Sequence, residues 1–314
     1  MRAPDDTTAG ILNAIGGTPI VELRAVVPHG SARVFAKLES ANPTGSMKDR
    51  MAKAVIDAAE ASGRLPPGGT VVEYTAGTTG ISLALACAAT RHPLEIVFSD
   101  AFSDEKRVTM EAFGARVTDV KSDNKTITEA LIKEMIRTAG EISRRPDHWW
   151  CDQLNNHDAV AGYLPLGDEI WSQTEGGVDA FVHAVSTAHS IHGVTAALWK
   201  NNPAIEIVAV EPAESAVLSG RPTGSHKIEG IGIGFVPPLW NPQLVNRIEM
   251  VWTDEAKAMT RRLAREEGIF AGTSTGANVV AALRTAARLG SDATVVTIVV
   301  DSGLRYVSTD VYRT

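Results

Sequence analysis

The sequence is poor in cysteine and in aromatic residues, and it has no long apolar run. Its two cysteines, Cys87 and Cys151, match neither a disulfide framework nor the spacing of a zinc site, which favours a reducing compartment. No run approaches the roughly 18 apolar residues that cross a bilayer. The opening stretch MRAPDDTTAG lacks the apolar centre of a signal peptide. We therefore expect a cytoplasmic protein that does not bind membranes.

An excess of positive charge is also absent. The formal net charge is -7, which argues against binding to nucleic acid or to an anionic membrane surface. The 314 residues, of which 44% are hydrophobic, suffice for one large α/β domain or two medium ones. These values are typical of a globular protein, so the function has to be inferred from motifs.

Short β-branched runs alternate with longer segments of helical periodicity. We predict buried strands at 34–39, 70–75, 94–100, 115–120, 180–185, 205–211 and 294–301. We predict helices at 46–61, 79–90, 104–113, 126–142, 191–200, 254–267 and 275–289. Such alternation indicates βαβ units, and therefore an α/β protein with mainly parallel, twisted sheets covered by helices on both faces.

One lysine stands in an unusual setting, within the stretch ANPTGSMKDR. Asn42 and Gly45 favour a turn, and Ser46 is a good helix N-cap. Lys48 would then lie in the first turn of the helix, where the positive end of the helix dipole disfavours a charged amine. A lysine whose proton is destabilised is suited to act as a nucleophile. A lysine on a solvated helix face is the simpler alternative.

Three junctions between a strand and a helix are rich in glycine, serine and threonine, at 75–82, 185–193 and 271–280. In open α/β sheets, ligands bind at the carboxyl ends of the strands, so each junction could offer N–H groups and hydroxyls to an anion. Two familiar nucleotide motifs are not met. The glycine cluster EGIGIGFVPP continues into prolines instead of a helix, and the P-loop pattern is absent.

Several segments, in order along the chain, resemble the cysteine synthase / cystathionine β-synthase family, which are fold type II enzymes that use pyridoxal 5'-phosphate (PLP). KLESANPTGSMKDR resembles the cofactor-lysine motif and is the most specific match, and EYTAGTTGIS resembles the loop that binds the substrate carboxylate. The remaining matches are ILNAIGGTPIVEL, CDQLNN, HKIEGIGIGFVP, AGTSTGA and DSGLRY. The resemblance covers nearly the whole chain.

The resemblance implies two α/β domains, with the cofactor in the cleft between them. A smaller, mobile domain at 41–152 would bind the substrate carboxylate. A larger domain, at 13–40 and 153–314, would bind the PLP phosphate. The family also implies a homodimer.

The resemblance also assigns roles by position. Lys48 would form the Schiff base with PLP, and Ser274 would hydrogen-bond the pyridine nitrogen. A hydroxyl at that nitrogen would leave it largely unprotonated, which suits β-elimination over transamination. Substrate contacts would come from Thr75, Ala76, Gly77, Thr79, Gln153 and Arg221. Cofactor contacts would come from Lys48, Thr78, Ser186, Thr187, Ala188, His189, Ser190 and Ser274.

Two loops depart from the family pattern. The family's Thr-Ser-Gly-Asn-Thr-Gly is Thr-Ala-Gly-Thr-Thr-Gly at 75–80, so Thr78 replaces an asparagine that bonds the ring oxygen. The family's Gly-Thr-Gly-Gly-Thr is Ser-Thr-Ala-His-Ser at 186–190. If a lost glycine had needed φ > 0, this second loop must follow a different path. We expect it still to bind phosphate through its hydroxyls and through the N–H groups of the following helix.

The reaction implied is PLP-dependent β-replacement on an O-activated L-serine. Lys48 would remove the Cα proton, the β-substituent would leave, and sulfide or another small nucleophile would add to the aminoacrylate. The altered loops favour a specialised member. A β-eliminating lyase is one alternative, and a catalytically silent relative that binds a metabolite or partner is another, although the retained Lys48 and Ser274 argue against it.

Three histidines close in sequence raise the question of a metal site. They are His183, His189 and His192. We expect no metal there, because His183 lies in a predicted buried strand and no carboxylate joins the histidines at ligand spacing.

Overall fold

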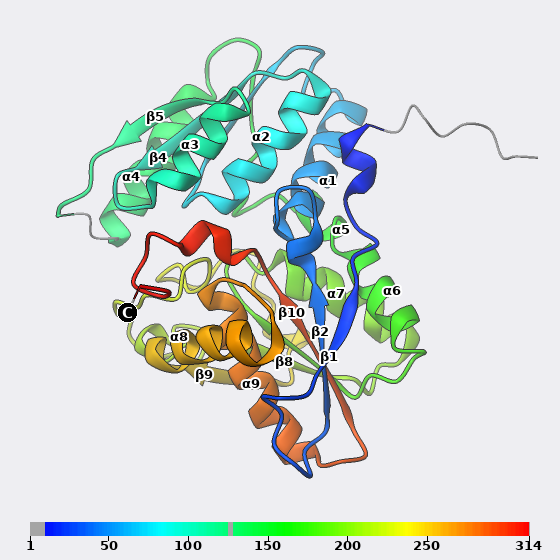
Figure 1. Ribbon diagram of the computed structural model, residues 1–314. Helices are drawn as coiled ribbons and strands as arrows, with labels where there is room; N and C mark the ends of the chain where they lie inside the picture. The colour runs from blue at the N-terminus through cyan, green and yellow to red at the C-terminus, as the bar shows by residue number, and fades with distance from the viewer. Residues whose placement is uncertain (1–9, 125–127, 314) are drawn as a thin grey trace, which may run out of the picture. The chain divides into compact units, whose positions relative to one another are not determined.

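Parallel strands alternate with helices along most of the chain in the computed structural model, which describes residues 10–124 and 128–313 (Figure 1). The chain divides into two units. The first comprises the chain through Gly17 together with Asn42–Asp152, and the second comprises Thr18–Ala41 together with Gln153–Thr314. The stretch in which no signal peptide is expected and the predicted helix start at Thr126 lie wholly or largely outside the described residues.

The first unit contains a four-stranded parallel sheet in the order β5-β4-β3-β6. Its strands are β3 (Thr70–Tyr74), β4 (Leu94–Ser99), β5 (Arg116–Val120) and β6 (His148–Trp150). Its α-helices are α1 (Lys48–Ala61), α2 (Thr78–Thr90), α3 (Asp104–Ala112) and α4 (Glu129–Ile142). Helix α1 packs against α2, and both α2 and α4 contact strands β3 and β4. The connection from β3 therefore opens directly into the N-terminus of α2.

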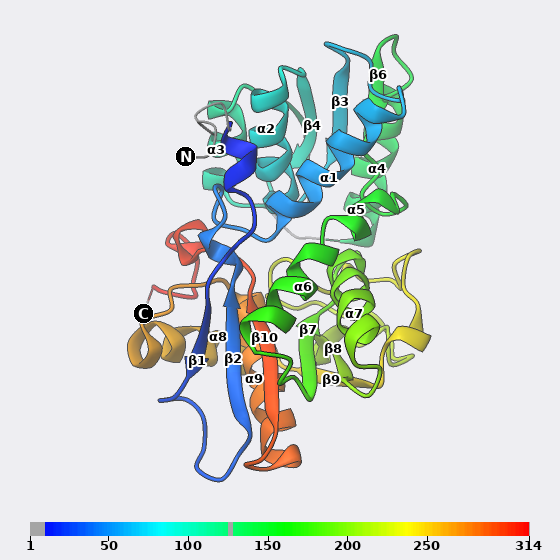
Figure 2. The same cartoon turned by 90° about the vertical axis from the view of Figure 1, so that its right-hand side faces the viewer.

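The second unit contains a six-stranded sheet in the order β1-β2-β10-β7-β8-β9, in which only β1 runs antiparallel to its neighbour. Its strands are β1 (Ile20–Leu23), β2 (Arg33–Leu38), β7 (Ala180–Ala184), β8 (Glu206–Pro212), β9 (Arg247–Val251) and β10 (Thr294–Val299). Its α-helices are α5 (Asp158–Ala161), α6 (Leu164–Gln173), α7 (His189–Asn201), α8 (Thr253–Arg262) and α9 (Thr273–Leu289). Figure 2 shows α6 and α7 on one face of this sheet and α8 and α9 on the other.

The core between this sheet and α9 combines branched residues on the strands with small residues on the helix. Val182, Val208 and Val295 come from the strands, and Ala277 and Ala281 from α9. Small side chains let the helix lie close to the sheet, so that a polar residue on α9 can reach the strand backbone. This close packing determines the geometry of the site described below.

The predicted α/β class and parallel sheets are confirmed, and each predicted strand and helix is present among the described residues. Two details were wrong. The strand predicted at 115–120 as buried is β5, an edge strand whose residues are exposed or half-exposed. Helix α1 begins at Lys48 with Met47 as its cap, so Ser46 is not the N-cap residue.

The prediction also missed several elements. Strands β1, β6 and β9 and helices α5 and α6 were not expected; most of them are too short to show a clear periodicity. Helix α8 continues past Arg262 as a π-helical stretch, Leu263–Glu267, and not as one uniform α-helix. Within the described part of the chain, no helix has the length and apolar character needed to cross a membrane.

Candidate active site

A tightly bonded turn precedes Lys48. The N–H of Gly45 donates to the carbonyl of Asn42 at 2.7 Å, and Gly45 has φ = +76°, a conformation that suits glycine. Asp49, buried in the first turn of α1, accepts from the N–H of Thr44 at 2.7 Å and from its hydroxyl at 2.5 Å. The Ser46 hydroxyl accepts from the N–H of Lys48 at 3.2 Å. These bonds fix the backbone on both sides of the lysine.

The amine of Lys48 is easier to deprotonate than an ordinary lysine. Burial among protein atoms disfavours its charged form and lowers its pKa from 10.5 to about 8. The residue as a whole keeps intermediate solvent exposure. The lowered pKa agrees with the sequence-based expectation, but its main cause is burial and not the helix dipole.

Residues 75–79, predicted to bind the substrate carboxylate and called the carboxylate loop below, span the connection from β3 into the first turn of α2 in the same unit. The hydroxyl of Thr75 accepts hydrogen bonds from the N–H groups of Gly77 at 2.9 Å and Gly80 at 3.3 Å. Ala76 is exposed, Thr78 is half-buried and Thr79 is buried. The lysine turn reaches this helix, because the hydroxyls of Thr44 and Ser82 are 3.4 Å apart. The fold therefore joins the predicted lysine helix and the predicted carboxylate loop within one unit.

Gly77 has a backbone that other residues cannot adopt without strain. It caps α2 with φ = +126° and ψ = -57°. A Cβ atom there would lie 2.3 Å from Cδ of Lys106, in α3. Lys106 is only 3% exposed, and sequence reasoning did not single it out. Its methylene chain covers the loop at the position where the substrate carboxylate is predicted to bind.

Residues 186–190, predicted to bind the cofactor phosphate and called the phosphate loop below, connect β7 to α7 in the second unit. Ala188 is the N-cap of α7 and has φ = +70° and ψ = -5°. Left-handed backbone is costly for alanine, so the loop keeps the conformation of a glycine at a position where glycine is absent. Ser186 is half-buried, and the other loop residues are buried. The first N–H groups of a helix have no partner within that helix and attract anions.

Histidines bind both side-chain hydroxyls of the buried part of this loop. His183 Nε2, at the end of β7, lies 2.8 Å from Oγ of Ser190. His189 Nδ1 lies 2.9 Å from Oγ1 of Thr187. His189 was predicted as a cofactor contact, whereas His183 was predicted only as part of a buried strand.

Ser274 lies at the start of α9 and is 1% exposed. One turn later, Asn278 is fully buried, and its Oδ1 accepts from the N–H of Ala184 at 2.7 Å. Residues four apart lie on the same face of a helix. Ser274 and the phosphate loop are therefore brought to the same side of α9, which faces β7.

Gln153 and Arg221 remain predictions as substrate contacts. Gln153 is 7% exposed and opens the second stretch of the second unit. Arg221 is exposed, and its N–H donates to the carbonyl of Ala216 at 3.0 Å. The loop that carries Arg221 is held by the buried Glu211, which accepts from the N–H groups of Leu218 and Ser219.

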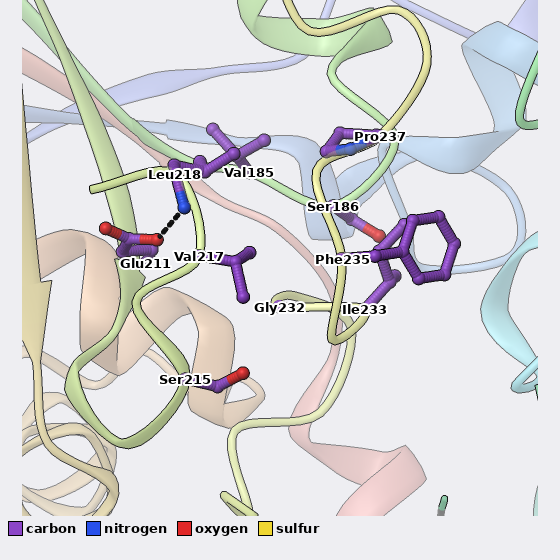
Figure 3. A pocket seen from close by; sticks show the side chains of 10 residues that line it. All are labelled: Val185, Ser186, Glu211, Ser215, Val217, Leu218, Gly232, Ile233, Phe235 and Pro237. Atoms are coloured by element: carbon purple, nitrogen blue, oxygen red, sulfur yellow. Dashed lines mark hydrogen bonds between the residues drawn. The ribbon is translucent and has the colours of Figure 1, made fainter. Parts of the chain in front are cut away.

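A small, partly open pocket adjoins residues 186–190 (Figure 3). Ser186 forms one wall, Gly232 and Phe235 form another, and the loop anchored on Glu211 forms a third. The segment EGIGIGFVPP, which fails the dinucleotide motif, thus lies beside the phosphate loop.

Two other kinds of site concern the histidines and cysteines of the described residues: a metal site and a reactive cysteine. Within residues 10–124 and 128–313, no three histidine, cysteine or acidic side chains are placed to share a metal ion. His192 stacks on Trp240, with ring centroids 6.4 Å apart. Cys87 and Cys151 are free and buried, and burial raises the pKa of each thiol. Lys48 is consequently the better nucleophile.

Two residues of the site, His183 and Asn278, could have been found only in part from sequence. Asn278 follows Ser274 by one helical turn, which places both on one face. A histidine in the apolar run AFVHAV needs a polar partner when buried, and Ser190 lies across the strand–helix junction. Sequence spacing does not reveal that Asn278 of α9 lies beside His183, which in turn contacts Ser190.

Comparisons with known proteins show which family the chain resembles. A family model described as pyridoxal-phosphate dependent enzyme matches residues 11–301. A cysteine synthase of Staphylococcus aureus is 42% identical over 304 residues, which cover 96% of each chain. The solved cysteine synthase of Entamoeba histolytica is 36% identical, with a TM-score of 0.90 over 100% of this chain and 94% of that chain. A solved O-ureido-L-serine synthase is 34% identical, with a TM-score of 0.89 over 96% of this chain and 94% of that chain.

Proposed function

Because the chain belongs to the family of pyridoxal-phosphate dependent enzymes, we propose that it catalyses β-replacement on an O-activated L-serine, with O-acetyl-L-serine as donor and sulfide as nucleophile. The products would be L-cysteine and acetate. The observation that carries the proposal is Lys48, whose pKa is lowered to about 8 at the start of α1, in a chain 42% identical to a cysteine synthase.

The side chains present suit PLP. The cofactor needs an unprotonated amine for its aldehyde, several donors for a dianionic phosphate and a polar group at its ring nitrogen. Lys48 supplies the amine. The hydroxyls of Thr187 and Ser190, with the N-terminus of α7, supply donors for the phosphate. The buried hydroxyl of Ser274 suits the ring nitrogen.

When bound, PLP supplies an electron-withdrawing ring that acidifies the Cα–H bond of the amino acid. The loop at 75–79 would hold the substrate carboxylate at the N-terminus of α2, where the Thr75 hydroxyl fixes the backbone by accepting from the N–H groups of Gly77 and Gly80. The amine of Lys48 would take the proton from Cα, and the acetate would leave Cβ with the C–O bonding electrons. Lys48 would return the proton to Cα after sulfide forms the new C–S bond.

The two altered loops support a specialised member of the family. Thr78 is shorter than the asparagine that it replaces, so it would leave space near the cofactor ring. Lys106 adds a long side chain over Gly77. A nucleophile other than sulfide is therefore compatible with the proposal. One solved structure that is 34% identical is named an O-ureido-L-serine synthase and not a cysteine synthase. We further propose a cytoplasmic homodimer, as the family resemblance implies.

The experiment is to supply the purified, PLP-loaded protein with O-acetyl-L-serine and sulfide and to measure cysteine. Lys48→Met should abolish cysteine formation. Lys53→Met is the matched control, because Lys53 lies on the same helix and pairs at the surface with Asp57. Loss of activity in both variants, or in neither, would contradict the assignment. Alternative nucleophiles are screened in the same assay.

A further inference from the structure

We propose that His183 is a positioning residue that orients the hydroxyl of Ser190 so that its proton points toward the cofactor phosphate. The inference rests on the proposed function, because it assumes that residues 186–190 hold the phosphate. It adds a residue outside that loop, and it gives a physical reason why the Ser190 hydroxyl presents its proton in one direction.

The starting point is the orientation of the Asn278 side chain on α9. Its Oδ1 accepts from the N–H of Ala184 at 2.7 Å, and its Nδ2 donates to the carbonyl of Ile298 at 2.9 Å. Ala184 is in β7 and Ile298 is in the neighbouring β10. A backbone N–H can only donate and a carbonyl can only accept, so these two contacts fix which end of the amide is nitrogen.

The fixed amide in turn selects the tautomer of His183. The Nδ2 of Asn278 lies 3.4 Å from Nδ1 of His183, and an amide nitrogen donates. Nδ1 of His183 is therefore the acceptor, and the ring proton of the neutral imidazole is on Nε2. Nε2 then donates to Oγ of Ser190, 2.8 Å away.

A serine hydroxyl that accepts from histidine keeps its own proton for another acceptor. Ser190 is the second residue of α7, in the first turn, whose N–H groups favour an anion. A phosphate there accepts hydrogen bonds and donates none when dianionic. If the hydroxyl rotated the other way, its oxygen would face the phosphate, and the two would repel each other. The series from Asn278 to His183 to Ser190 prevents that rotation.

Burial makes the arrangement effective. His183 is 1% exposed and Ser190 is 7% exposed, so water competes little for these hydrogen bonds. A similar pair, His189 and Thr187, lies on the same loop. In the family pattern, positions 187 and 190 both carry threonine, so their hydroxyls are retained here, whereas the two glycines between them are replaced by Ala188 and His189. With those glycines gone, histidine contacts order the two hydroxyls.

The test compares binding of PLP with binding of pyridoxal, which lacks the phosphate, to the cofactor-free full chain. The readout is the ratio of the two affinities, measured by absorbance titration. Ser190→Ala should lower this ratio about tenfold, the value of one hydrogen bond to a charged group. His183→Asn should lower it roughly three- to tenfold, because its shorter amide does not reach Ser190. His183→Gln, which places an N–H near the position of Nε2, should restore the ratio to within about twofold.

A second variant keeps the test decisive if His183→Asn does not fold. Asn278→Ala removes the donor to Nδ1 without adding a charge, so neither tautomer of His183 is held and the Ser190 proton no longer has a fixed direction. The ratio should fall about as far as in Ser190→Ala, and by no more than about twofold further when both changes are combined.

The outcomes separate this inference from the proposed function. If His183→Asn weakens PLP and pyridoxal equally, the histidine is only structural and the inference is wrong, while the phosphate site stands. If Ser190→Ala leaves the ratio unchanged, the phosphate lies elsewhere and both the site and the inference are wrong. The cysteine assay tests the reaction independently of either result.

Discussion

In the cofactor-free protein, we expect the amine of Lys48 to lose its proton near pH 8. Its pKa falls from 10.5 to about 8 because the surrounding protein disfavours the charged form. At pH 7 a pKa of about 8 leaves about 9% of the amine unprotonated, whereas a pKa of 10.5 leaves about 0.03%. The nucleophilic form of Lys48 is therefore about 300-fold more abundant than that of an ordinary lysine.

Competitive labelling measures this protonation directly. Trace acetic anhydride reacts only with unprotonated amines, and mass spectrometry after digestion reports the labelled fraction of Lys48. A free lysine derivative in the same solution, with a pKa near 10.4, is the reference. Labelling of Lys48 should reach half of its plateau at about pH 8, some two pH units below the reference. A midpoint shared with the reference would refute the argument that burial destabilises the charged amine.

The lowered pKa of Lys48 also makes the folding stability depend on pH. Between pH 8 and 10.5, the unfolded chain binds more protons at this lysine than the folded chain, so folding stability rises with pH in that window. Below pH 8 the full penalty applies, and its upper limit is about 3 kcal/mol. Because Lys48 keeps some solvent exposure, we expect about half of that limit.

Lys48→Met should therefore make the cofactor-free protein more stable than wild type at pH 7, by about 1–2 kcal/mol. The difference should shrink as the pH rises toward 10.5, and denaturant unfolding at several pH values measures it. A methionine variant that is less stable at pH 7 would show that the lysine is held by favourable contacts and not strained by burial.

Four further changes test the two altered loops and the loop that carries Arg221. Thr78→Asn, which restores the family residue, should change the ranking of nucleophiles by kcat/KM, and an unchanged ranking would place specificity elsewhere. Ala188→Gly should raise the free energy of unfolding by about 1 kcal/mol, because glycine adopts φ > 0 without strain, as a melting curve would show. Gly77→Ala should weaken substrate binding strongly, since its Cβ would meet Lys106 at 2.3 Å, and titration with substrate measures the loss. Arg221→Ala should reduce turnover of O-phosphoserine but not of O-acetylserine. Equal losses on both substrates would show that Arg221 does not recognise the substrate.

Much of the fold follows from periodicity alone. The β-branched runs are buried in parallel sheets, as in β7, whose residues are all buried. The prediction fails where a strand lies at an edge or is very short. Strand β5 contains β-branched residues, as its neighbours do, but it is exposed or half-exposed, because it lies at the edge of the sheet and the order of the strands cannot be read from one run of residues.

For the candidate site, the sequence singled out Lys48 but attributed its properties to a different physical cause. Lys48 was singled out through the helix dipole, and the structure attributes its lowered pKa to burial. Burial depends on which segments of the fold surround the amine, and no local pattern in ANPTGSMKDR encodes that. Lys106 was missed for the same reason, since its contact with Gly77 joins two helices that are separate in sequence.

The phosphate loop shows how a changed sequence can retain a backbone. The loss of glycine predicted a different path if positive φ was required, and Ala188 nevertheless has φ = +70°. Its neighbours provide the constraint: on one side β7 is bonded to α9 through Asn278, and on the other Ser190 is bonded to His183. A strained residue persists when the surrounding contacts determine its conformation. The hydrogen bond of His183 and the positive φ of Ala188 therefore belong together, because side-chain hydrogen bonds hold this loop in a conformation that glycine would adopt without strain.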